Sequence, residues 1–210
     1  MIGYYNKSVV ATYLGLISAV TGIRFAILGE MRIALLCLMF SGLCDMIDGP
    51  IARGCRRSPD EQSFGIQIDS LCDLVCFGAL PAVICLMADG KAWYTTAIAG
   101  YYMLAAVIRL GYFNVQEISR VRSDPGRRKV YDGLPVTSAA LIFPAFAAID
   151  AALGAKMGGF YALPLAAVGV LFIAPFHIPK LHTRGLIACG LIGAAIFAAV
   201  IALGGNLTYL

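Results

Sequence analysis

The sequence predicts an all-α fold, a polytopic transmembrane bundle of about six to seven helices. Hydrophobic residues make up 60% of the 210 positions and charged residues only 13%, whereas a soluble domain carries about 25% charged residues. The apolar residues form runs of about 20, the length that a membrane-spanning helix needs. In lipid, a continuous run of this length satisfies its backbone polar groups only as a helix. We expect residues 1–210 to form one integral-membrane domain.

Seven apolar runs are predicted to cross the membrane. In chain order they are 9–28, 31–52, 65–88, 92–113, 134–153, 158–176 and 184–206. The 158–176 run contains Gly158, Gly159 and Pro164, which weaken a helix, so whether it crosses the whole bilayer is left open.

The basic residues predict the orientation of these helices. With the loops numbered alternately from the N-terminus, one set holds eleven Lys and Arg residues and the other holds four. Cytoplasmic loops carry the excess of Lys and Arg, so we expect a cytoplasmic N-terminus. The richer set comprises Lys7, Arg53, Arg56, Arg57, Arg120, Arg122, Arg127, Arg128, Lys129, Lys180 and Arg184.

Four aspartates interrupt these apolar runs, and carboxylates inside a membrane segment indicate a functional site. Asp45 and Asp48 are three residues apart, and Asp69 and Asp73 are four apart. Each pair therefore shares one face of its helix. Two facing pairs would gather about four negative charges, and all-oxygen ligands favour Mg²⁺, Mn²⁺ or Ca²⁺. Asp48 and Asp69 fall near the predicted cytoplasmic ends, so the cluster should open toward the cytosol.

Small residues and one arginine follow the first pair. Gly49 and Ala52 permit a close approach to the helix backbone. Arg53 lies one helical turn past Gly49, where its guanidinium suits a phosphate. The alternatives are close helix packing for Gly49 and Ala52 and a snorkelling anchor for Arg53. Beside four aspartates we favour the functional interpretation, which is phosphoryl chemistry with bound metal.

The complete pattern resembles the signature of the CDP-alcohol phosphotransferases. It reads Asp45-x-x-Asp48-Gly49-x-x-Ala52-Arg53, then Gly65-x-x-x-Asp69-x-x-x-Asp73. The resemblance implies a transfer from a CDP-linked donor to an acceptor hydroxyl, with release of CMP. It also implies that the four aspartates bind two divalent ions (Mg²⁺ or Mn²⁺) and that Asp73 is the catalytic base. The residues that it places against CDP are Gly49, Ala52, Arg53 and Gly65.

The spacing between the two halves departs from this family. Eleven residues separate Arg53 from Gly65, about three more than is common in the family. We expect the extra length in a cytoplasmic loop, Gly54–Phe64. Gln62 and Ser63 fall where many members place a Ser or Thr near the nucleotide, so both are candidate CDP contacts.

Three further segments resemble the phosphatidylserine synthases within this family. They begin at Asp69-Ser70-Leu71-Cys72-Asp73, at Arg109-Leu110-Gly111 and at Gly133-Leu134-Pro135. The resemblance implies phosphatidyl transfer from CDP-diacylglycerol to L-serine. Tyr112 replaces an arginine that is frequent in these enzymes, so glycerol 3-phosphate or an inositol phosphate stays open as the acceptor.

A serine acceptor carries a carboxylate that needs a cationic or donor partner. Arg109 and Asn114 are the candidate acceptor-binding residues, since both fall near the expected cytoplasmic end of the 92–113 run. The alternatives are a snorkelling anchor for Arg109 and a helix C-cap for Asn114.

The remaining expectations concern partners and location. We expect a bacterial or archaeal cell membrane, contact with membrane lipid, no nucleic-acid partner and, from the resemblance, a homodimer. Seven scattered cysteines predict neither a disulfide framework nor a zinc site. An ion transporter is the remote alternative, but its charges belong near mid-bilayer on repeated or broken helices, and the sequence shows no repeat.

Overall fold

The computed structural model describes residues 3–4, 9–55, 58–88, 92–123, 130–154, 161–179 and 183–203. Helices dominate it, which confirms the predicted all-α class. The elements are α1 (Val10–Ile27), α2 (Met31–Gly54), α3 (Pro59–Asp73), the π-helical segment η2 (Leu74–Ala79), α4 (Leu80–Ala88), α5 (Trp93–Ser123), β1 (Val130–Asp132), the 3₁₀ segment η3 (Val136–Ser138), α6 (Ala139–Ala152), α7 (Ala162–Ile173), β2 (His177–Pro179) and α8 (Thr183–Ala202).

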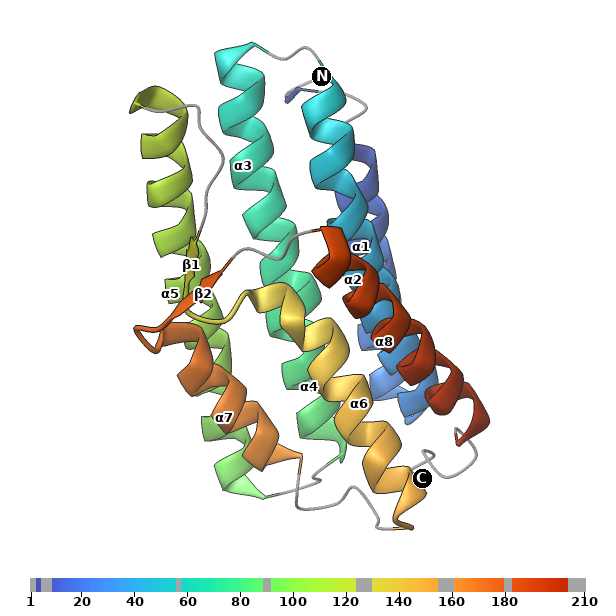
Figure 1. The fold of residues 1–210 in the computed structure, drawn as a ribbon. Coiled ribbons are helices and arrows are strands. Elements are labelled where there is room, and N and C mark those ends of the chain that lie inside the picture. The colour runs from blue at the N-terminus through green and yellow to red at the C-terminus, as the bar shows by residue number, and fades with distance from the viewer. Residues whose placement is uncertain are drawn as a thin grey trace.

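Successive passes of the chain run in alternating directions (Figure 1). Four helical stretches are long and apolar enough to cross a membrane, namely α1, most of α2, the continuous stretch from α3 through α4, and α5 as far as Ser119. The helices α6, α7 and α8 contribute shorter apolar stretches. The 12 residues of α7 extend about 18 Å, which is less than the hydrocarbon thickness of a bilayer.

Two helices extend well beyond their predicted apolar runs. α3 begins at Pro59, so most of the expected Gly54–Phe64 loop is helix. Ser58 accepts a hydrogen bond from the Glu61 N–H, and the Glu61 carboxylate accepts one from the Ser58 N–H. This capping box, with proline at the first helical position, starts a helix even in polar sequence. α5 continues to Ser123, ten residues beyond the apolar run.

Helices α1 and α2 form an antiparallel pair that approaches closely at small residues. The Ser41 hydroxyl of α2 lies 2.9 Å from the Gly15 carbonyl oxygen of α1. A Cβ atom on Gly15 would lie 3.3 Å from the Cys44 Cβ atom. This contact brings α1 against the same face of α2 that carries Asp45 one turn later and Asp48 two turns later.

A short antiparallel ribbon was not predicted. β1 pairs with β2, with Tyr131 opposite Ile178. Next to it, Gly133 has a φ of +71° and donates its N–H to the Phe176 carbonyl at 2.6 Å. A Cβ at Gly133 would lie 2.9 Å from the Phe172 carbonyl oxygen. The Gly133-Leu134-Pro135 segment therefore fixes the entry into η3 and α6.

Candidate active site

The two predicted carboxylate pairs meet at one place between α2 and α3. One oxygen of each of Asp45, Asp48 and Asp69 lies within 4.8 Å of the others. Asp73 lies one turn deeper along α3, is only 9% exposed, and lines the same small pocket as Asp45 and Asp48. The structure thus brings together all four aspartates that the spacing singled out.

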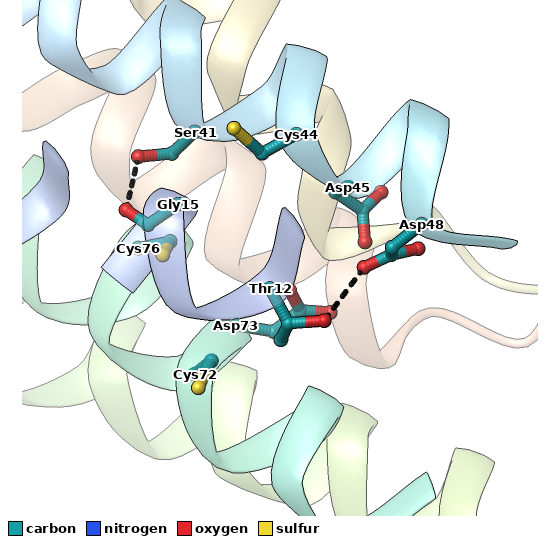
Figure 2. A pocket seen from close by; sticks show the side chains of 9 residues that line it. All are labelled: Thr12, Gly15, Ser41, Cys44, Asp45, Asp48, Cys72, Asp73 and Cys76. Atoms are coloured by element: carbon teal, nitrogen blue, oxygen red, sulfur yellow. Dashed lines mark hydrogen bonds between the residues drawn. The ribbon is translucent and has the colours of Figure 1, made fainter. Parts of the chain in front are cut away.

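Helix α1 completes the pocket at which the two pairs meet. Its walls come from three successive passes, and Figure 2 shows their side chains directed inward from α1, α2 and α3–η2. The pocket holds about 10 Å³, the space of about one water-sized group. Its lining residues are Thr12, Gly15, Ser41, Cys44, Asp45, Asp48, Cys72, Asp73 and Cys76.

Thr12 was not among the predicted site residues. Its hydroxyl donates a hydrogen bond of 3.1 Å to the Asp48 carboxylate (Figure 2). Thr12 is 8% exposed and lies 36 positions from Asp48 in the sequence. No motif marks a single threonine in an apolar run, so only the packing of α1 on α2 reveals it.

The donor set of this cluster fits a hard divalent cation. Carboxylate oxygens of three aspartates converge within 4.8 Å, and Mg²⁺ and Mn²⁺ prefer such oxygen ligands. Cys44, Cys72 and Cys76 line the adjacent pocket and are free thiols. None of the seven cysteines, all of which lie among the described residues, is in a disulfide bond.

An apolar groove lies beside this polar pocket. The α1–α2 groove has a volume of about 550 Å³ and shares Cys44 with the pocket. Along α2 it runs from Phe40 to Ile51, a distance of about 16 Å at 1.5 Å per residue. It is lined by Val10, Ala11, Leu14, Phe40, Leu43, Cys44, Ile47 and Ile51. A single alkyl chain matches this length and this apolar lining.

The predicted CDP contacts lie on the helix turns next to the aspartates. Gly49 and Ala52 follow Asp48 on α2, and Gly65 precedes Asp69 by one turn on α3. Gln62 and Ser63 belong to α3 and not to a loop. Arg53 belongs to α2, but its side chain lies outside the described residues. The role of these residues as CDP contacts stays a prediction.

Arg109 lies deeper in the bundle than its sequence position suggested. α5 continues 14 residues beyond it, to Ser123, so Arg109 is not near the end of its helix. Its side chain is 6% exposed, and its Nε donates a 3.2 Å hydrogen bond to the Leu134 carbonyl. A snorkelling anchor is therefore excluded. Arg109 connects α5 to the segment that enters α6.

Asn114 connects α5 to the helix that carries Asp69 and Asp73. Its Oδ1 accepts a 2.6 Å hydrogen bond from the Ser70 hydroxyl, and its Nδ2 donates a longer one, 3.4 Å, to the Gln67 side chain. The helix C-cap alternative is wrong, because α5 continues past Asn114. Its amide lies against residues that neighbour Asp69 in the chain.

The sequence is similar to those of several known proteins. The sequence is 33% identical over 135 residues to the CDP-diacylglycerol–serine O-phosphatidyltransferase of Saccharomyces cerevisiae, covering 62% of this chain and 48% of that protein. It is 29% identical over 181 residues to the archaetidylserine synthase of Methanothermobacter thermautotrophicus, covering 82% and 70%. It is 26% identical over 199 residues to the Mycobacterium leprae CDP-diacylglycerol–serine O-phosphatidyltransferase, covering 91% and 63%.

The chain thus spans about half of the yeast relative and between 63% and 70% of the other two. The sequence model of the CDP-alcohol phosphatidyltransferases matches residues 6–199, which includes every carboxylate of the cluster and nearly all of the helical bundle. The chain belongs to the CDP-alcohol phosphatidyltransferase family.

Proposed function

We propose that this protein transfers the phosphatidyl group of CDP-diacylglycerol to the hydroxyl of L-serine and releases CMP. The observation that carries the proposal is the convergence of Asp45, Asp48 and Asp69 within 4.8 Å, with Asp73 buried beside them. Relatives named for serine phosphatidyl transfer align with most of the chain, and this supports serine as the acceptor.

The four aspartates are proposed to hold two divalent cations, Mg²⁺ or Mn²⁺. When bound, such ions would neutralise the charge of the donor's diphosphate and of the leaving CMP. Asp73 is the proposed catalytic base, since it is the most buried carboxylate of the cluster. Its carboxylate takes the proton from the serine hydroxyl as the oxygen attacks the phosphorus that bears diacylglycerol. The bond from that phosphorus to the CMP oxygen breaks.

The nucleotide is proposed to bind where α2 and α3 carry small and polar residues beside the cluster. The proposed contacts are Gly49, Ala52, Arg53, Gln62, Ser63 and Gly65. Gly49 and Gly65 leave backbone accessible on facing helices, and a guanidinium at Arg53 suits a diphosphate. Capping of α3 at Ser58 by Glu61 supports this end of the site, since it makes Gln62 and Ser63 part of a fixed helix turn.

Arg109 and Asn114 are the proposed residues on the acceptor side. Both are side chains of α5, and Asn114 contacts the turn of α3 between Asp69 and Asp73 through Ser70. A serine carboxylate placed there would meet cationic and amide donors near Asp73.

The α1–α2 groove supports a donor that stays in the membrane. The groove is apolar, and Cys44 lines both the groove and the carboxylate pocket. A donor whose headgroup reached the aspartates could place one acyl chain along Leu14 and Phe40 without leaving the bilayer. We further propose that the aspartates face the cytoplasm, as the excess of basic residues at that end favours, and that the protein is a homodimer.

The test is the release of CMP from CDP-diacylglycerol by purified protein in detergent with Mn²⁺ or Mg²⁺. Serine, glycerol 3-phosphate and inositol phosphate are supplied in separate reactions. The proposal expects serine-dependent CMP release that ends when the metal is chelated. Release with another acceptor would replace serine but keep the chemistry. No release with any acceptor would refute the proposed activity.

A further inference from the structure

The helix that carries Asp69 and Asp73 changes its geometry directly after Asp73. α3 passes into η2, a π-helical segment from Leu74 to Ala79, and then into α4. At the end of η2, the Leu80 N–H bonds to the Val75 carbonyl, five residues back and not four. Single π turns inside α-helices are rare and frequently occur at functional sites. Here the wide turn begins at the proposed catalytic base.

Pro81 leaves one buried carbonyl of this stretch without its α-helical donor. In a regular α-helix the Phe77 carbonyl would accept a hydrogen bond from the N–H of the residue four positions later, which is Pro81. Proline has no N–H, so the α-helical donor for this carbonyl is missing. Phe77 is 0% exposed, and an unsatisfied carbonyl buried in a membrane helix costs several kcal/mol.

Tyr102 of α5 supplies the missing donor. Its hydroxyl donates a 2.5 Å hydrogen bond to the Phe77 carbonyl oxygen. Tyr102 is 0% exposed, and its ring packs against Phe143 and Phe172 with centroid distances of 5.7 and 5.4 Å. The ring is therefore held from both sides, and the hydroxyl is fixed in place beneath the wide turn.

The register of this turn determines where Asp73 lies relative to the core. Beyond η2, the helix is anchored by Leu80, Ile84 and Cys85, all 0% exposed. A turn that holds one residue more or fewer rotates the preceding helix by about 100° relative to this anchor. Asp73 is the last residue before the turn, so a change of register would move its carboxylate away from Asp45 and Asp48.

We propose that Tyr102 is a positioning residue for Asp73: its hydroxyl replaces the hydrogen bond that Pro81 cannot make and fixes the wide turn that directs Asp73 toward the other aspartates. This inference rests on the proposed function only for the role of Asp73 as base. Tyr102 itself is not among the residues that line the pocket of Asp45, Asp48 and Asp73.

The test compares two buried tyrosines that differ in their hydroxyl contacts. Tyr161 is also 0% exposed and packs against Phe143 and Phe146, but its hydroxyl has no hydrogen-bond partner among the residues that the structure describes. Tyr102→Phe and Tyr161→Phe each remove one hydroxyl and keep the ring. Both are assayed for kcat, for the KM of serine and, without substrates, for Mn²⁺ affinity by electron paramagnetic resonance.

We expect Tyr102→Phe to lower kcat and Mn²⁺ affinity by about 10- to 100-fold, as the loss of a supporting hydrogen bond does in metal sites. The KM of serine should stay unchanged, and Tyr161→Phe should match the parent protein in all three measurements. A Tyr102→Phe protein with the kcat and Mn²⁺ affinity of the parent would overturn the proposal, even if its melting temperature fell. The Mn²⁺ measurement needs no turnover, so it decides this proposal even if the proposed activity is wrong.

A second variant tests the specific partner of the hydroxyl and keeps the proposal testable if Tyr102→Phe does not fold. Pro81→Ala restores an N–H at the position from which an α-helix would donate a hydrogen bond to the Phe77 carbonyl. We expect Tyr102→Phe/Pro81→Ala to fold and to recover Mn²⁺ affinity and kcat relative to Tyr102→Phe alone. A double variant that folds but binds Mn²⁺ no better than Tyr102→Phe would refute the role assigned to this hydrogen bond. If Tyr102→Phe does not fold, the double variant is compared with Asp73→Asn instead. A double variant that binds Mn²⁺ no better than Asp73→Asn would then refute the role.

Discussion

Thr12 on α1 and Asp48 on α2 share a hydrogen bond of 3.1 Å at the edge of the carboxylate cluster. The hydroxyl holds one oxygen of the same carboxylate that lies close to Asp45 and Asp69. The first helix, which carries no acidic residue, thereby takes part in the site. Residues that orient metal ligands in this way commonly contribute 10- to 100-fold to metal affinity.

Replacement of Thr12 should therefore weaken metal binding without loss of the fold. Thr12→Val keeps the shape of the side chain and removes the donor to Asp48. We expect Mn²⁺ affinity to fall by about tenfold, measured by electron paramagnetic resonance. Thr21→Val on the same helix is the control, because the Thr21 hydroxyl donates to the Ile17 carbonyl at an exposed position. Equal Mn²⁺ affinity in the two variants would contradict the prediction.

Replacement of Asp73 should remove the chemical step. Asp73→Asn keeps the size of the side chain but cannot take a proton from the acceptor hydroxyl, so we expect CMP release to slow by about 10²- to 10⁴-fold. Single-turnover measurements of CMP release provide the check. Asp60→Asn is the control, because Asp60 lies on an exposed turn at the start of the same helix. Comparable turnover in the two variants would exclude Asp73 as the base.

Ser70 and Asn114 should depend on each other energetically. The Ser70 hydroxyl donates to Asn114 Oδ1 at 2.6 Å, so either alanine variant removes the same hydrogen bond. In a double-mutant cycle we expect a coupling free energy of unfolding of about 0.6 kcal/mol, typical for polar pairs in membrane proteins. Asn114 and Ser138 provide the control cycle, since the Ser138 hydroxyl bonds to the Pro135 carbonyl. Equal coupling in the two cycles would argue against a specific Ser70–Asn114 bond.

Obstruction of the α1–α2 groove should discriminate between donors. Leu14→Trp places a bulky ring in the groove that we propose for an acyl chain. We expect slower turnover of long-chain CDP-diacylglycerol in liposomes and unchanged turnover of a short-chain, water-soluble donor. Leu104→Trp on α5 is the control, because Leu104 is equally apolar and exposed but does not line the groove. Equal loss with both donors would show that the groove does not hold the lipid chain.

Gly42, at the contact between α2 and α6, should not tolerate replacement even by alanine. A Cβ on Gly42 would lie 2.5 Å from the Ala140 Cβ atom, so Gly42→Ala must push the helices apart. We expect a loss of about 1–3 kcal/mol in the free energy of unfolding, measured in detergent. Ala140→Gly in the same protein should restore most of it.

Gly100→Ala is the matched control for this substitution. Nothing lies within 4 Å of the Cβ that it would add to α5, so the variant should be at least as stable as the parent. Similar destabilisation by Gly42→Ala and Gly100→Ala would mean that α2 and α6 do not pack closely at Gly42.

Several helix boundaries were predictable only in part. The 31–52 run agrees with α2 to within two residues, because hydrophobicity is a local property of the chain. The start of α3 was missed, although Ser58-Pro59-Asp60-Glu61 carries the signal of a capping box. A polar helix turn outside the apolar run does not register in a search for membrane spans. The same reason explains why α5 extends ten residues past the expected end.

The sequence by itself determined the helical class of this protein and singled out the four aspartates that the fold brings together. Hydrophobic runs and a spacing of three or four residues are both local, and the helical period converts them directly into faces. Only the tertiary structure decided that Thr12 supports Asp48, that Asn114 contacts Ser70, and that Tyr102 supplies the donor that Pro81 lacks. These contacts join side chains or backbone groups between 25 and 44 positions apart. Their geometry follows from how whole helices pack, a property that the order of residues along one helix does not contain.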